Sequence, residues 1–162
     1  MHKTRCRGHT FLKRKVKKMI EPDTIKLLRE CDAGVKMGIS SIDEVLPYVR
    51  SRELRKLLEE CKREHEVLKE EMLSLLARYG DDGKNPSPIA KGMSWMKTAT
   101  KLAMHDNDHT IADLMTDGCN MGVKSLNGYL NEYKAAEEKV KDIAKRLINL
   151  EEKLAIDVRG YL

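Results

Sequence analysis

Aromatic residues are scarce in this chain of 162 residues, which contains one Trp, one Phe and five Tyr, or 4% of the sequence. Leu, Met, Ile, Lys, Glu and Arg dominate instead, and this composition is typical of long amphipathic helices. No stretch approaches the run of about 18 apolar residues that a membrane-spanning helix needs, so we expect no membrane span. The length suits one domain with its own hydrophobic core.

Cysteine is also scarce, and the four Cys residues form no CxxC spacing. This absence argues against a zinc ribbon and against the disulfide framework of a small secreted domain. Cys31 and Cys61 lie among apolar helix positions, where a free Cys behaves as a small hydrophobic residue. We therefore predict a reducing, cytoplasmic location.

A Gly-rich phosphate loop and a nucleophile elbow are missing too, so we predict no catalytic residue and no cofactor.

Basic charge is concentrated at the start of the chain. Residues 1–18 contain eight of the 31 Lys and Arg residues and no acid, which leaves 23 basic against 26 acidic residues in the remainder. The segment has no apolar periodicity, so we predict a disordered basic tail over 1–18. One interpretation is an upstream extension with Met19 as the natural start. The other is an arm that contacts nucleic acid or anionic lipid, although Phe11 alone offers little base stacking.

The sequence repeats itself. Residues 34–46, GVKMGISSIDEVL, match residues 118–130, GCNMGVKSLNGYL, at a shift of 84 positions. At a shift of 86 the apolar positions of the following segments also match, and His65 corresponds to Glu151. Such self-similarity indicates that one supersecondary unit is used twice.

Apolar periodicity predicts five helices, over residues 23–46, 52–79, 89–104, 110–133 and 137–161. Local signals support their ends: Pro47 follows the first helix, Gly80 follows the second, and Asp106, Asn107 and Asp108 precede the fourth. Two hairpins of long helices joined by a long connection predict an all-α four-helix bundle over residues 19–162. The crossover between the hairpins contains the additional short helix.

The duplicated hairpin and long crossover resemble ferritin-like bundles. The sequence looks most like a small, uncharacterised bacterial ferritin-like family, a domain of unknown function. Members carry a Gly-Trp-x-x-Lys-like stretch in the crossover, which residues 92–97 (GMSWMK) resemble, and a Gly-Glu pair in the helix after it, where Asp117-Gly118-Cys119 stands. The resemblance covers roughly residues 23–162 and implies a ferritin-like four-helix bundle of bacterial origin.

The ligands of a ferritin-like metal site are largely missing. Such sites use a Glu from each of two helices and a Glu-x-x-His from each of the other two. The small-residue stretches that we expect to face inward on the first and third long helices contain no carboxylate. The second offers His65, preceded at the third position by Lys62, and the fourth offers Glu151. We expect no bound metal, and His65 and Glu151 remain two candidate ligands that we expect to hydrogen-bond to each other.

Four glycines occupy helix interiors, where each costs about 1 kcal/mol relative to Ala. Gly34 and Gly38 lie one turn apart, as do Gly118 and Gly122. We interpret them as helix-packing positions where two helix backbones approach closely, so that bulk at Gly38 or Gly122 pushes the helices apart. The alternative is space for a ligand between the helices.

A separate cluster combines His105, Asp106, Asp108 and His109. It could supply metal ligands, but the sequence favours a solvated capping loop.

These observations favour a non-enzymatic protein that acts by binding or assembly, with an unknown protein partner or by self-association. One alternative is a divalent-metal protein with a reduced site around His65 and Glu151. Another is an adaptor whose tail, residues 1–18, contacts nucleic acid or anionic lipid.

Overall fold

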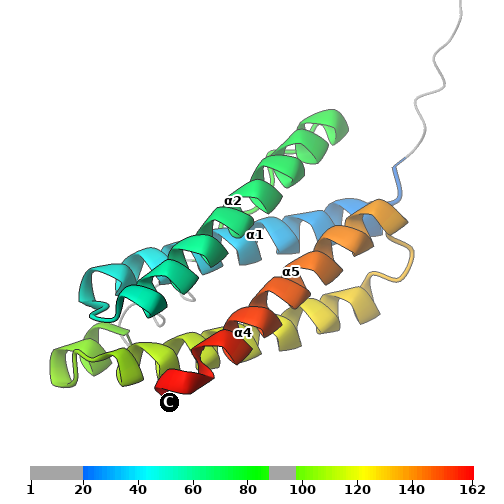
Figure 1. Ribbon diagram of the computed structural model, residues 1–162. Coiled ribbons are helices and arrows are strands. Elements are labelled where there is room, and N and C mark those ends of the chain that lie inside the picture. The colour runs from blue at the N-terminus through cyan, green and yellow to red at the C-terminus, as the bar shows by residue number, and fades with distance from the viewer. Residues whose placement is uncertain (1–19, 88–97) are drawn as a thin grey trace, which may run out of the picture.

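The computed structural model describes residues 20–87 and 98–162, and within them it contains helices and no strand (Figure 1). Four long helices dominate: α1 (Pro22–Val45), α2 (Arg52–Tyr79), α4 (Asp108–Glu132) and α5 (Glu138–Asp157). Short 3-10 helices follow two of them, η1 (Leu46–Tyr48) and η2 (Val158–Tyr161), and residues 98–104 are also helical. The predicted tail and the motif at residues 92–97 lie outside the described residues.

Local sequence signals set the helix ends. The Ser51 side chain accepts a hydrogen bond from the backbone N–H of Leu54 at the start of α2, and Asn107 does the same for Thr110 at the start of α4. Gly80 ends α2 in the left-handed conformation, with φ of 69°. The predicted starts of the four long helices are confirmed to within two residues. The last helix is shorter than predicted because α5 tightens into η2 after Asp157.

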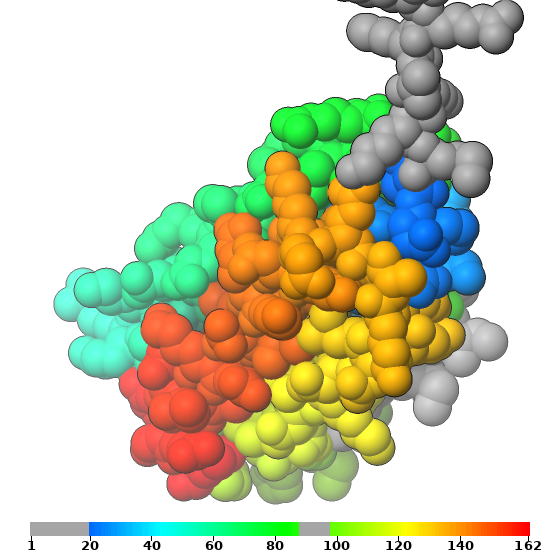
Figure 2. Space-filling view, turned by 90° about the vertical axis from the view of Figure 1, so that its right-hand side faces the viewer, coloured from blue at the N-terminus to red at the C-terminus, as the bar shows by residue number. Residues whose placement is uncertain are grey.

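The long helices form two antiparallel pairs, α1 with α2 and α4 with α5 (Figure 1). α1 and α5 run in one direction, and α2 and α4 run in the other. In the space-filling view, α5 lies between α2 and α4 (Figure 2). α2 ends at the opposite end of the molecule from the start of α4 (Figure 1).

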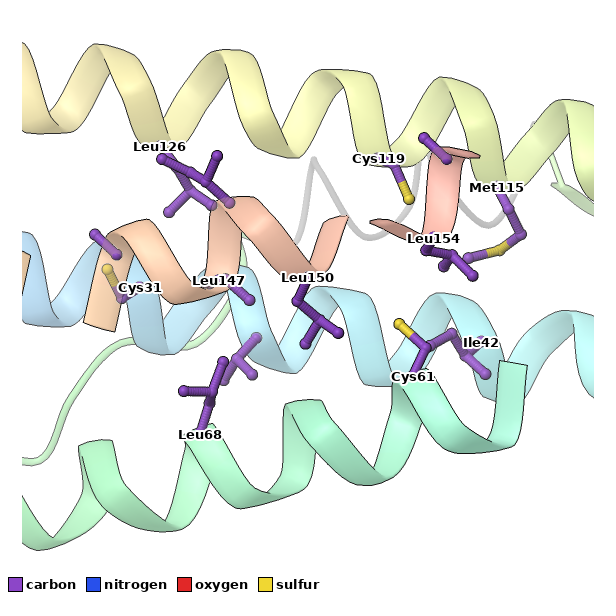
Figure 3. Packing of buried hydrophobic residues seen from close by; sticks show 14 of the residues in the cluster. Cys31, Ile42, Cys61, Leu68, Met115, Cys119, Leu126, Leu147, Leu150 and Leu154 are labelled. Atoms are coloured by element: carbon purple, nitrogen blue, oxygen red, sulfur yellow. The ribbon is translucent and has the colours of Figure 1, made fainter. Parts of the chain in front are cut away.

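One hydrophobic core joins all four helices (Figure 3). Many positions related by the two shifts of the predicted repeat are both buried, although the small residues matched between 34–46 and 118–130 are not. At a shift of 84 the buried pairs are Leu27 and Ile111, Leu28 and Ala112, Cys31 and Met115, Val35 and Cys119, and Ile42 and Leu126. At a shift of 86 they are Leu54 and Val140, Leu58 and Ala144, Cys61 and Leu147, Leu68 and Leu154, and Met72 and Val158. The two hairpins therefore bury the same faces of their helices.

The small residues of α4 do not all face inward as expected. Gly118 and Ser125 are exposed, and Met121 exposes 65% of its surface. The buried stripe of α4 instead runs through Met115, Cys119 and Leu126. Adjacent residues on a helix point about 100° apart. Gly118 is therefore turned away from the buried side of α4 that its neighbour Cys119 occupies, and it is exposed.

The cluster around Asp108 joins three segments of the chain. Its two carboxylate oxygens accept hydrogen bonds from the backbone N–H groups of Arg50 and Ser51, at 2.8 Å each, just before α2. Asp106 forms an ion pair with the exposed Arg50 side chain, and His109 approaches the carbonyl oxygen of Tyr161. The cluster therefore holds the start of α2 against the start of α4 and is not arranged around a metal ion.

We predict that Asp108→Ala lowers the free energy of unfolding by about 1–2 kcal/mol, because two backbone donors lose a charged acceptor. Urea unfolding measures the change. Asp106→Ala serves as the control, since an exposed ion pair contributes less than about 1 kcal/mol. Equal effects of the two substitutions would contradict the bracing role of Asp108.

Candidate functional site: a buried histidine–glutamate pair

His65 of α2 and Glu151 of α5 meet in the interior, as predicted. His65 Nε2 lies 2.9 Å from Glu151 Oε1, which confirms the expected hydrogen bond. Both residues are buried, and His65 exposes only 1% of its surface. The two positions are 86 residues apart, the same shift that relates the buried positions of the two hairpins. Polar groups in such a place are tolerated only when they find partners.

Both ring nitrogens of His65 face acceptors. Nδ1 lies 2.9 Å from the backbone carbonyl oxygen of Cys61, one turn earlier in α2, and Nε2 faces the Glu151 carboxylate. A carbonyl oxygen can only accept a hydrogen bond, so Nδ1 carries a proton, and an ionised carboxylate requires a proton on Nε2 as well. The network accommodates an imidazolium paired with a carboxylate, the stronger, charge-assisted kind of hydrogen bond.

The pKa of His65 reflects two opposing effects. Burial alone lowers it, but the hydrogen bonds with the Cys61 thiol and with Glu151, together with the charge of Glu151, raise it from 6.5 to about 10. The charged form of His65 is therefore favoured in the folded protein despite its burial.

We predict a pH-dependent contribution of this pair to stability. Because the folded-state pKa of His65 is raised, the contribution is complete below pH 6.5 and is lost as the pH rises toward about 10. The measurement compares urea unfolding of the unmodified chain and of His65→Leu with Glu151→Leu from pH 6 to 10. As the pH rises across this range, the free energy of unfolding of the unmodified chain should fall relative to that of the double variant. A difference that stays constant with pH would contradict the assignment.

Glycines on α1 and α4 lie beside the pair. A Cβ atom added at Gly38 would stand 2.6 Å from His65 Nε2 and 2.8 Å from His65 Cδ2. At Gly122 it would make ordinary contacts with Glu151, at 3.6 Å from Cδ and 3.7 Å from Cγ. At Gly34 it would meet only a Leu147 side chain, and at Gly118 nothing within 4 Å. Side chains, rather than the predicted opposing backbone, thus lie nearest to Gly34, Gly38 and Gly122, and of the four glycines only Gly38 lacks room for a side chain.

Two thiols border the pair. The sulfur atoms of Cys61 on α2 and Cys119 on α4 point into the space between the helices (Figure 3). Burial raises the pKa of the Cys119 thiol well above its usual range, and the charge of Glu151 and a hydrogen bond with it raise the pKa further. A thiol in this environment stays protonated and is a poor nucleophile.

The pair lacks the further ligands of a metal centre. Within residues 20–87 and 98–162, no three His, Cys, Asp or Glu side chains come together in a way that could hold a metal ion. Both nitrogens of His65 are already engaged by protein acceptors. A metal ion would have to displace the Glu151 hydrogen bond to reach Nε2. As arranged, the pair can hold and share a proton and can fix the relative position of α2 and α5.

Sequence reasoning missed a second buried carboxylate, Asp32 of α1, which is fully buried. Its Oδ2 accepts hydrogen bonds from Lys36 Nζ at 2.7 Å and from the backbone N–H of Lys84 at 2.9 Å. Gly83, with φ of 77°, passes so close that a Cβ atom there would collide with Asp32. Asp32 therefore anchors the start of the crossover on α1. In the sequence, Asp32 lies at helical spacing between Leu28 and Val35 on the apolar stripe, and this position could have indicated a buried carboxylate.

No helix in the described part of the chain is both long enough and apolar enough to cross a membrane. No protein-family model matches the sequence, and no curated protein matches it. Among solved structures, the fold is similar to the crystal structure of a DUF305 fragment from Deinococcus radiodurans. The TM-score is 0.69 at 15% sequence identity, over 87% of this chain and 95% of that one. The similarity establishes that this chain shares the fold of an all-helical domain of unknown function.

Proposed function

We propose that this chain is a ferritin-like four-helix bundle, built from two repeated hairpins, in which a His–Glu pair stands where related bundles hold metal. We further propose that it is a non-enzymatic bacterial protein of the cytoplasm that acts by binding a protein partner or by self-association. The shared burial of positions 84 and 86 residues apart supports the repeat.

The observation that carries the proposal is the closed hydrogen bonding of His65. Its Nδ1 is engaged by Cys61 and its Nε2 by Glu151, each at 2.9 Å. Gly38 packs against the ring so closely that a methyl group would not fit beside it. A substrate or a metal ion would need an open position at this point. The arrangement thus favours a structural role for the centre of the bundle. Binding of a partner or of a second copy would then take place on the surface.

Metal analysis of protein purified without a His tag tests the proposal. We expect substoichiometric Zn²⁺, Mn²⁺ and Fe²⁺ and no rise of the melting temperature when each ion is added, because a ligand that binds only the folded state must stabilise it. Elution volume and light scattering of the same sample report self-association.

The contact between His65 and Glu151 also supports the second candidate, a reduced divalent-metal site. Stoichiometric binding of one ion that Glu151→Gln abolishes would replace the first proposal by this one. Glu152→Gln is the matched control, since Glu152 is exposed on the same helix.

A further inference from the structure

The His65–Glu151 pair lies where two similar halves of the molecule meet. We call α1 with α2 the N-terminal hairpin and α4 with α5 the C-terminal hairpin. His65 and Glu151 occupy the same place in the two hairpins, yet they contact each other. The corresponding helices run in opposite directions, α1 against α4 and α2 against α5 (Figure 1), as an approximate twofold axis between the two halves requires. The pair therefore lies on this axis.

The neighbouring apolar positions distinguish the hairpins poorly. Around the pair, α2 contributes Leu58, Cys61, Leu68 and Met72, and α5 contributes Ala144, Leu147, Leu154 and Val158. Two N-terminal hairpins from two chains would also bring apolar faces together, and so would two C-terminal hairpins. Residues of about the right size and polarity specify a core only loosely.

At the axis, however, two hairpins of the same kind would bring two identical side chains together. Two N-terminal hairpins would place His65 against His65, and two C-terminal hairpins would place Glu151 against Glu151. Like charges cannot both persist at that distance in a buried site, so one imidazole would lose its proton and one carboxylate would gain one. Both assemblies would also replace the ion pair by a hydrogen bond between one charged and one neutral group. Only an N-terminal hairpin combined with a C-terminal hairpin supplies opposite charges.

We propose that the His65–Glu151 pair determines which hairpins pack together and disfavours assemblies in which like hairpins from two chains combine. Single buried polar groups set the pairing of helices in this way in coiled coils. The inference rests on the geometry of the pair and on the repeated hairpins proposed above, and it does not depend on whether the protein acts by binding or by assembly.

The test makes the two positions identical while keeping polar side chains that can hydrogen-bond. The variant is His65→Gln with Glu151→Gln, and the reciprocal exchange, His65→Glu with Glu151→His, is the matched control. Full-length chains are unfolded in urea and refolded over a range of protein concentrations. Light scattering after gel filtration gives the fraction of dimer. Cross-linking of mixed ¹⁴N- and ¹⁵N-labelled chains shows whether α2 of one chain contacts α2 or α5 of another.

We expect the Gln–Gln variant to form a severalfold larger fraction of dimer than the unmodified chain, with cross-links between α2 segments of different chains. The reciprocal exchange should refold like the unmodified chain. A Gln–Gln variant with an unchanged dimer fraction, or with interchain cross-links only from α2 to α5, would overturn the proposal. Failure of this variant to fold would overturn it as well, because the pair would then be required for folding itself.

Discussion

Replacing His65 with Ala should lower the free energy of unfolding by about 3–5 kcal/mol, the typical cost of removing one partner of a buried ion pair. The substitution leaves the Glu151 carboxylate buried without the donor that lies 2.9 Å away in the unmodified protein. It also leaves a cavity at a residue that exposes only 1% of its surface. Urea unfolding at pH 7 followed by circular dichroism gives the change.

The double substitution His65→Leu with Glu151→Leu should recover much of that loss. Apolar residues of similar volume often replace a buried ion pair without net cost, because they avoid its desolvation. The comparison separates the cost of an orphaned carboxylate from the cost of lost packing. If the double variant were as unstable as His65→Ala, packing around the imidazole would explain the effect and the ion pair would not.

The sequence allowed the helices and the central contact to be predicted because their signals are local or repeated. Ser51, Asn107 and Gly80 act within one turn of the helix ends that they set. The contact between His65 and Glu151 followed from the repeat, since two corresponding buried polar residues on facing helices each need a partner. The fold comparison adds only that another helical domain adopts the same arrangement.

Other features escaped prediction because they depend on contacts between distant segments. Asp32 is stabilised by the backbone of Lys84, 52 residues away, and no periodicity reports such a contact. Gly38 and Gly122 looked alike in the repeat, but only Gly38 faces the imidazole ring. A repeat indicates which positions correspond. It does not indicate which of two corresponding glycines faces the larger side chain.

That asymmetry leads to the second large effect, in which Gly38→Ala is destabilising and Gly122→Ala is not. The Ala methyl group at position 38 would lie 2.6 Å from His65 Nε2. The ring cannot turn away freely, because Cys61 and Glu151 hold its two nitrogens. Overpacking of this kind costs about 1–3 kcal/mol, and weakening the ion pair adds to it.

Gly122→Ala is the matched control at the corresponding position of α4. Its methyl group would make ordinary contacts with Glu151, the nearest at 3.6 Å, and Ala gains about 1 kcal/mol over Gly in a helix interior. That gain applies to both positions, so the difference between the two variants in urea unfolding isolates the clash with the ring. Adding His65→Leu and Glu151→Leu to each glycine variant should shrink the difference, because the rigidly held ring is gone. Equal stability of Gly38→Ala and Gly122→Ala would show that the ring moves aside at no cost, and that the pair does not hold α2 and α5 in a fixed position.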